Sequence, residues 1–226
     1  MPEFSIHPEV AARYPGTRAG VLFIENVRLS RIDPAVEALK ENAVADLRRR
    51  FSSPNEVAAE PAITAWHAFY RQMHLDPQQV LPAQESLVRR LLDGTPFPTI
   101  CTLVDICNVV ASKFLIPVGA FDLDRIAGNI SLRLAAKGER MVPLGGSRPK
   151  GIPFNEVVYA DETQVFSRYT RDAEATKVTL ETRRSLVVLD LAPGQPDDLL
   201  DQAGESMVQT LRSCLGSRAR LERHAA

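Results

Sequence analysis

Residues 103–139 constrain the fold more than any other part of this chain of 226 residues. The stretch begins with apolar residues at the three-to-four-residue spacing of an amphipathic helix, and Pro117 breaks this pattern. A turn containing Gly119 is expected next, followed by a strand at 130–134, where apolar and polar residues alternate. The predicted helix carries a polar Asn108 among apolar neighbours, and position 119 has no side chain. These two positions call for a structural or functional explanation.

The rest of the chain alternates predicted strands and helices without a strict rhythm, which favours an α+β fold over a doubly wound sheet. No linker or repeat divides the sequence, so we expect a single domain over 1–226, closed by a last helix at about 196–216 and a frayed tail at 218–226. Strands are predicted at 4–6, 19–24, 157–161, 164–166 and 185–191, and helices after Asp33-Pro34 and Pro61 and at 82–92.

Composition excludes several classes of protein. The formal net charge is -1, so nucleic-acid binding would need a locally basic face rather than a basic whole. The three cysteines (Cys101, Cys107 and Cys214) lack C-x-x-C spacing, and the four histidines are scattered, so we expect no metal, no other cofactor and no disulfide framework. The N-terminus lacks the pattern of a signal peptide and no apolar run is long enough to span a membrane, which favours the cytoplasm.

Four polar residues are candidates for a site, and each also has a purely structural interpretation. Asn108 is a satisfied core amide or a ligand contact, and Asp105 is its partner or an anchor of the helix end. Asp122 follows the expected turn and caps the next one, or else binds a cation. Asp172 forms a surface ion pair with a nearby arginine, Arg168 or Arg171, or lies in a pocket.

The order of motifs in the central stretch is specific. It reads V-D-I-C-N, then P-V-G-A-F-D, then D-R-I-A-G-N-I-S-L-R-L-A-A-K-G-E. This order resembles the tRNA-editing (B3/B4) domain of the bacterial phenylalanyl-tRNA synthetase β subunit over residues 89–191. The resemblance implies a single α+β domain with a mixed, mostly antiparallel sheet.

The resemblance also assigns an editing pocket, residue by residue. The asparagine of the family's V-D-x-T-N motif is Asn108, and the threonine before it is replaced by Cys107. The histidine of the family's P-x-H-A-F-D motif is replaced by Gly119, and a glutamate at the end of a later strand by Asp190. The family's glycine-rich segment before that strand becomes S-R-Y-T-R-D. These departures imply a specificity other than that of an editor of mischarged tyrosine, for a polar or charged side chain.

The activity implied is trans-editing by a free-standing B3/B4 protein, which hydrolyses the ester of a mischarged aminoacyl-tRNA. Similar free-standing proteins deacylate canavanyl-tRNA(Arg), so tRNA(Arg) is the expected partner, with transient contact to a synthetase and none to a membrane or DNA. The expected residues are Asn108, Gly119 and Asp190 for catalysis, Cys107, Asp122, Arg168 and Asp172 for the substrate, and Arg89, Arg90, Arg148 and Lys150 for tRNA.

Two alternatives remain open from the sequence. A non-catalytic module that binds tRNA or a synthetase predicts affinity for tRNA without ester cleavage. A small-molecule hydrolase on the same fold predicts activity on free esters and indifference to tRNA. A shared fold does not by itself decide among these functions.

Overall fold

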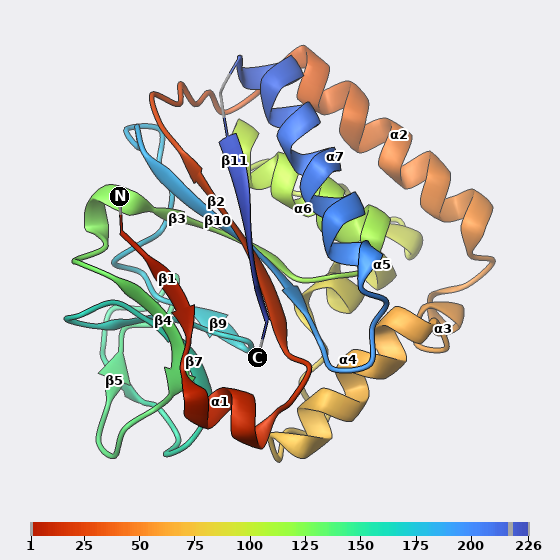
Figure 1. Cartoon of the computed structure of the whole chain (residues 1–226). Helices are drawn as coiled ribbons and strands as arrows, with labels where there is room; N and C mark the ends of the chain where they lie inside the picture. Colours follow the sequence, from red (N-terminus) through yellow and green to blue (C-terminus); the bar gives the residue numbers. More distant parts are fainter. Residues whose placement is uncertain (1, 217–218, 226) are drawn as a thin grey trace.

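Two sheets face each other across the centre of the fold, and helices cover the outer side of one of them (Figure 1). The computed structural model describes residues 2–216 and 219–225. Within these ranges, the first sheet has the order β1-β4-β7-β8-β9, with bounds Phe4–Ile6, Ile130–Leu134, Val157–Ala160, Val165–Arg168 and Arg171–Asp172. The second has the order β11-β2-β10-β3, with bounds Ala219–Ala225, Arg18–Ile24, Ser185–Leu191 and Val118–Asp122. A further small sheet pairs β5 (Arg140–Met141) with β6 (Lys150–Gly151).

These strands confirm the predicted α+β fold with mostly antiparallel pairing. Strand β1 runs parallel to β4, and the other pairs are antiparallel. The helices are α1 (Pro8–Arg13), α2 (Pro34–Arg50), α3 (Pro54–Val57), α4 (Pro61–Gln72), α5 (Ala83–Leu92), α6 (Thr102–Phe114) and α7 (Asp198–Leu215), with a 3-10 turn at Leu123–Arg125. Most of the strands belong to the two facing sheets, and β5 and β6 form the small third sheet.

Strand β10 is an inner strand of the second sheet. Its side chains point alternately to the two faces of the sheet and so contribute to two separate parts of the core. Leu186 and Val188 pack into the cluster between the two sheets, whereas Val187 and Leu189 pack against the helices. Because successive side chains of a strand point to opposite faces, Asp190 lies on the face of Leu186 and Val188. The sequence therefore directs a carboxyl group into the space between the sheets.

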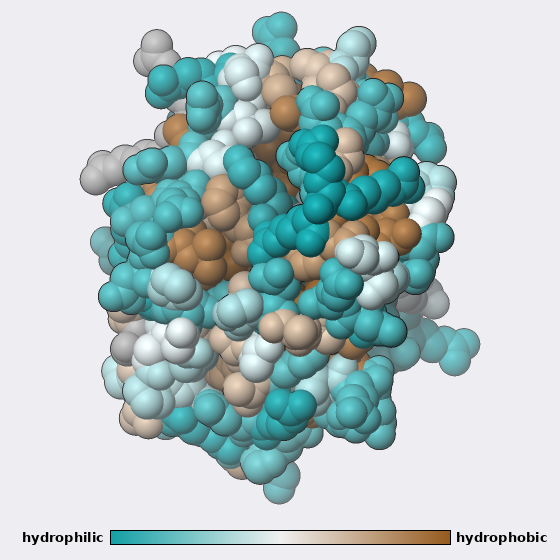
Figure 2. Space-filling view, turned by 90° about the vertical axis from the view of Figure 1, so that its right-hand side faces the viewer, coloured by the Kyte–Doolittle hydropathy of each residue, from teal (hydrophilic) through white to brown (hydrophobic). Residues whose placement is uncertain are grey.

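Helices α6 and α7 cover the other face of the second sheet, and α2 packs against α6 on the outside (Figure 1). Figure 2 shows this side of the molecule, where hydrophilic residues cover much of the surface and hydrophobic patches show between them. In the described residues, no helix is both long and apolar enough to cross a membrane.

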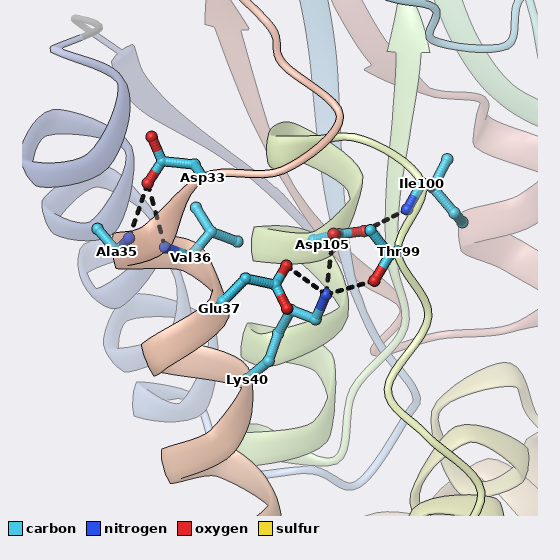
Figure 3. Close-up of polar contacts among 8 residues, drawn as sticks. All are labelled: Asp33, Ala35, Val36, Glu37, Lys40, Thr99, Ile100 and Asp105. Atoms are coloured by element: carbon cyan, nitrogen blue, oxygen red, sulfur yellow. Dashed lines mark hydrogen bonds and ion pairs between the residues drawn. The ribbon is translucent and has the colours of Figure 1, made fainter.

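A buried lysine joins α2 to the beginning of α6 (Figure 3). The side chain of Lys40 is only 3% exposed, and its Nζ lies 2.7 Å from Glu37 Oε1, 2.8 Å from Thr99 Oγ1 and 3.3 Å from Asp105 Oδ2. The other oxygen of Asp105 accepts a hydrogen bond from the backbone N–H of Ile100 at 3.0 Å. Asp105 is thus the anchor of the helix end rather than a partner of Asn108.

The connection after α6 differs from the prediction. The helix ends at Phe114, before Pro117, because Leu115 adopts the left-handed conformation with φ 56°. The expected turn at Gly119 is wrong, since Gly119 lies within β3 opposite Val188 of β10. A short segment such as V-G-A-F-D acquires its strand conformation from pairing with β10, which local sequence does not reveal.

The C-terminal segment also differs from the prediction. Residues 219–225 form β11, which pairs with β2 along its whole length, so they are not frayed. Residues 218 and 226 of the predicted tail lie outside the described residues.

Candidate active site

A cavity of about 440 Å³ lies where the ends of β3 and β10 meet the turn between β8 and β9. Its wall combines residues from both sheets with two from α5. The lining residues are Ala83, Arg90, Pro117, Val118, Gly119, Phe121, Leu144, Tyr159, Ser167, Arg168, Tyr169, Thr170, Arg171, Asp172, Val188 and Asp190. The structure therefore brings Gly119, Asp190, Arg168 and Asp172 together, although they come from segments far apart in the sequence.

Asp190 is the most deeply buried acid of this cavity, with 5% of its surface exposed. The hydroxyl of Tyr159 donates a hydrogen bond to Asp190 Oδ1, and that of Tyr169 lies 3.4 Å from the same oxygen. Burial raises the pKa of Asp190 to about 7, although the two hydroxyl groups favour the ionised form, and Asp172 raises it further. This carboxyl group therefore titrates near neutral pH.

Asp172 is a second carboxyl group in the same cavity. The hydroxyl of Ser167 donates to Asp172 Oδ1 at 2.7 Å across the β8–β9 pair. Burial raises the pKa of Asp172, while this hydrogen bond and the charge of Arg171 oppose the rise. The cavity thus holds two acids, of which neither forms an ion pair among the described residues.

Arg168 does not pair with Asp172, so the predicted surface pair between them is wrong. Its Nε lies 2.9 Å from Glu156 Oε1 and 3.1 Å from Thr170 Oγ1. Glu156 precedes β7 and is distant from Arg168 along the chain, so the sequence did not predict this ion pair. The pair neutralises the Arg168 charge, so that Asp172 and Asp190 are the acids of the lining without an ion pair among the described residues.

Aromatic residues of α4 fix the position of Tyr169. The ring of Trp66 lies 5.2 Å from that of Tyr169 and the ring of Phe69 lies 5.6 Å from it, both edge-on. The hydroxyl of Tyr70 donates to the backbone carbonyl of Tyr169 at 2.9 Å. The aromatic face of α4 is core, as its helical spacing indicates, and it supports one wall of the cavity.

Gly119 gives the ring of Phe121 room at the cavity wall. A Cβ atom at position 119 would lie 3.0 Å from Phe121 Cζ, tighter than an ordinary contact. A side chain here would have to displace the ring, so the glycine sets the width of the cavity on this side.

Three of the residues predicted for catalysis or for substrate binding do not line the cavity. Cys107 is packed in the apolar cluster between the second sheet and the helices, where burial raises the pKa of its thiol and keeps it neutral. Asp122 is held by the Thr182 hydroxyl at 2.7 Å and by the N–H of Asp124 at 3.0 Å, which is the capping role. Asn108 lies half-buried on α6 and is absent from the lining.

Of the four residues predicted to bind tRNA, Arg90 alone lines the cavity. Arg90 lines the cavity and is exposed, whereas Arg89 is half-buried and pairs with Glu85 at 3.2 Å. Arg148 and Lys150 are exposed in the segment that follows Leu144, which is itself a lining residue. The exposed basic residues of the lining are Arg90 and Arg171.

Sequence reasoning missed the two tyrosines that hydrogen-bond Asp190. Tyr159 lies in the apolar strand V-V-Y-A, where a buried hydroxyl must find a partner. That requirement is the one signal that could have found it. Among the described residues, no group of three or more histidine, cysteine, aspartate or glutamate side chains is placed to hold a metal ion.

The sequence is similar to those of known proteins. The sequence model of the B3/4 domain matches residues 65–197. The phenylalanine–tRNA ligase β subunit of Gloeobacter violaceus is 36% identical over 128 residues, which are 56% of this chain and 16% of that protein. The β subunit from Bordetella pertussis is 39% identical over 85 residues, 38% of this chain and 11% of that protein. This chain therefore spans far less than two thirds of these relatives.

The fold is also similar to a solved structure. An N-terminal fragment of the phenylalanyl-tRNA synthetase β subunit from Pyrococcus horikoshii superimposes with a TM-score of 0.53. The match covers 96% of this chain and 50% of that fragment at 14% sequence identity, so the likeness is one of fold.

Proposed function

This chain belongs to the B3/4 domain family, and on that premise we propose that it hydrolyses the ester of a mischarged aminoacyl-tRNA. The observation that carries the proposal is the charge arrangement of the cavity. Asp172 and Asp190 lie inside it, while Arg90 and Arg171 are exposed at its edge. The end of an aminoacyl-tRNA has the complementary arrangement, a cationic amino acid joined to an anionic phosphate backbone.

Asp190 is the group best suited to activate water. A general base works best when its pKa lies near the working pH, and burial brings the pKa of Asp190 to about 7. In this mechanism, water attacks the carbonyl carbon of the ester and gives a proton to Asp190. The bond between that carbon and the ribose oxygen breaks, and the proton passes to the departing oxygen. The products are a free amino acid and an uncharged tRNA.

The two tyrosine hydroxyls orient Asp190, and the shape of the cavity positions the ester. The raised pKa values of Tyr159 and Tyr169 keep both hydroxyls protonated, so they hold the orientation of Asp190. Gly119 leaves room for the ring of Phe121 in the cavity wall. Because the ester is already an activated bond, positioning a water and stabilising the developing oxyanion account for most of the required rate enhancement.

The acidic interior favours a substrate with a guanidinium-type side chain, and canavanine attached to tRNA(Arg) is our first candidate. A carboxylate forms strong charge-assisted hydrogen bonds with such a group. In this arrangement Asp172 binds the side chain of the amino acid, and Asp190 activates the water that attacks the ester. The oxyguanidinium of canavanine is more acidic than the guanidinium of arginine, so two closely placed carboxyl groups distinguish them by protonation as well as by shape.

The test is the loss of ester from tRNA(Arg) charged separately with canavanine and with arginine. We expect the canavanyl ester to be lost at least roughly tenfold faster, the scale on which a change of one side-chain group discriminates. Equal loss of both esters would place the discrimination outside this chain, for example in a partner synthetase.

Two other outcomes would support different functions. Binding of tRNA with no loss of any ester would support a binding module. Hydrolysis of free amino-acid esters at the same rate as aminoacyl-tRNA would support a small-molecule hydrolase on this fold.

A further inference from the structure

A second cavity, of about 680 Å³, opens beside the candidate active site and shares Arg90 with it. It lies between α4, α5 and the segment that joins them. Its lining residues are Ala58, His67, Arg71, Pro77, Gln78, Leu81, Glu85, Ser86, Arg89, Arg90 and Asp93. Because Arg90 lines both cavities, the two lie next to each other at this residue.

The second cavity carries a cationic surface. Arg71 and Arg90 are both exposed, and neither has an ion-pair partner among the described residues. Arg90 donates only to the backbone carbonyl of Ser86, at 3.2 Å. Two guanidinium groups are therefore free to bind an anion.

The acids of this cavity leave that surface positive. Glu85 is fully buried and is engaged by His67, whose Nε2 lies 2.6 Å from Glu85 Oε2, and by Arg89 at 3.2 Å from Oε1. The buried carboxylate thus holds two basic side chains at the cavity wall instead of offering its charge to solvent. Asp93 is the remaining acid of the lining.

We propose that this second cavity holds the single-stranded 3′ end of the RNA, with its phosphodiester groups on Arg71 and Arg90. The planar fork of arginine suits the bidentate contact that phosphate oxygens offer. Arg90 takes the phosphate nearest the ester, since it lines both cavities, and Arg71 takes a phosphate further from the ester. The inference rests on the proposed function in one respect, that the ester end occupies the first cavity.

The test is binding of a fluorescent single-stranded RNA that ends in CCA, measured by anisotropy over a range of salt concentrations. Arg71→Ala should weaken binding about five- to tenfold and reduce the slope of log affinity against log salt by about 0.7, the value for one lost phosphate contact on a single strand. Arg31→Ala, which removes an exposed arginine outside both cavities, is the matched control and should leave affinity and slope unchanged.

The RNA measurement separates this inference from the proposed function. Loss of affinity and slope in Arg71→Ala supports the RNA path even if no ester is hydrolysed. Unchanged affinity and slope in Arg71→Ala, or no binding by the wild-type protein, overturns it even if esters are hydrolysed. With an active protein, the same variant should slow deacylation of aminoacyl-tRNA and leave hydrolysis of aminoacyl-adenosine, which has no phosphate, unaffected.

Discussion

Asp190→Asn is expected to abolish ester hydrolysis and, at the same time, to stabilise the folded protein at pH 8. The amide can still accept hydrogen bonds from the Tyr159 and Tyr169 hydroxyls, so the local structure is kept. The amide cannot take a proton from water. It also carries no charge, so it cannot attract a cationic substrate. Asp190 is only 5% exposed, so the loss of its charge also removes the cost of burying an ionised group.

The size and pH dependence of the stabilisation follow from the raised pKa. Between about pH 4 and pH 7 the folded protein keeps the Asp190 proton while the unfolded chain has lost it, so wild-type stability falls as pH rises through this window. A shift from 3.8 to about 7 corresponds to at most about 4 kcal/mol. We therefore expect Asp190→Asn to match the wild type at pH 4 and to exceed it by about 2–4 kcal/mol at pH 8.

Urea unfolding at pH 4, 6 and 8 measures this difference, and single-turnover ester loss measures the activity. Glu41→Gln removes an exposed carboxylate of α2 and serves as the control for the change of net charge. If Asp190→Asn kept wild-type activity, Asp190 would not be the general base. A difference in stability that does not grow with pH would mean that Asp190 is ionised throughout the range.

Lys40→Met is expected to destabilise the fold by about 3–5 kcal/mol, the usual loss when one partner of a buried ion pair is removed. Asp105 is 1% exposed, and burial already raises its pKa despite Lys40 and the Ile100 N–H. Without the ammonium group, the Asp105 carboxyl group has no ion-pair partner among the described residues, and it must take up a proton or remain as a buried charge. The link between α2 and the start of α6 in Figure 3 would then be weakened.

The double variant Lys40→Met with Asp105→Asn provides an internal test. Because both charges are gone, we expect it to recover roughly half or more of the stability lost in Lys40→Met. Lys137→Met, at an exposed position, is the matched control and should change the free energy of unfolding by less than about 0.5 kcal/mol. A single variant as stable as the wild type in urea unfolding would show that the Lys40 pair contributes nothing to the fold.

The sequence was sufficient for those parts of the fold in which local pattern and packing agree. The apolar run at 185–191 predicted a central strand, and β10 has those bounds. Pro34 after Asp33 predicted the start of α2, where Asp33 accepts hydrogen bonds from the N–H groups of Ala35 and Val36. In both, the residues that specify the element lie within it or directly before it.

The sequence was insufficient wherever a partner distant in the chain decides the outcome. Gly119 lies in a strand because β10 pairs with it, and residues 219–225 form a strand because β2 does. Arg168 binds Glu156 rather than its neighbour Asp172 because β7 and β8 bring the two together. Such pairing depends on long-range contacts that no local pattern encodes.

The candidate site shows both limits. Resemblance to the family pointed to Gly119, Asp190, Arg168 and Asp172, and these four line one cavity. It pointed equally to Asn108, Cys107 and Asp122, which do not. A family motif identifies which positions of the sequence are candidates. The direction and the surroundings of each side chain depend on how this chain packs.

A crystal structure with an unreactive mimic of the substrate would test the central claim most directly. Adenosine carrying canavanine through a 3′ amide in place of the ester is a suitable ligand. We predict that the aminoacyl group lies between β3–β10 and the β8–β9 turn, with its side chain on Asp172 and the amide carbonyl within one water of Asp190. Binding of the ligand elsewhere, with the cavity around Asp190 left empty, would contradict the account.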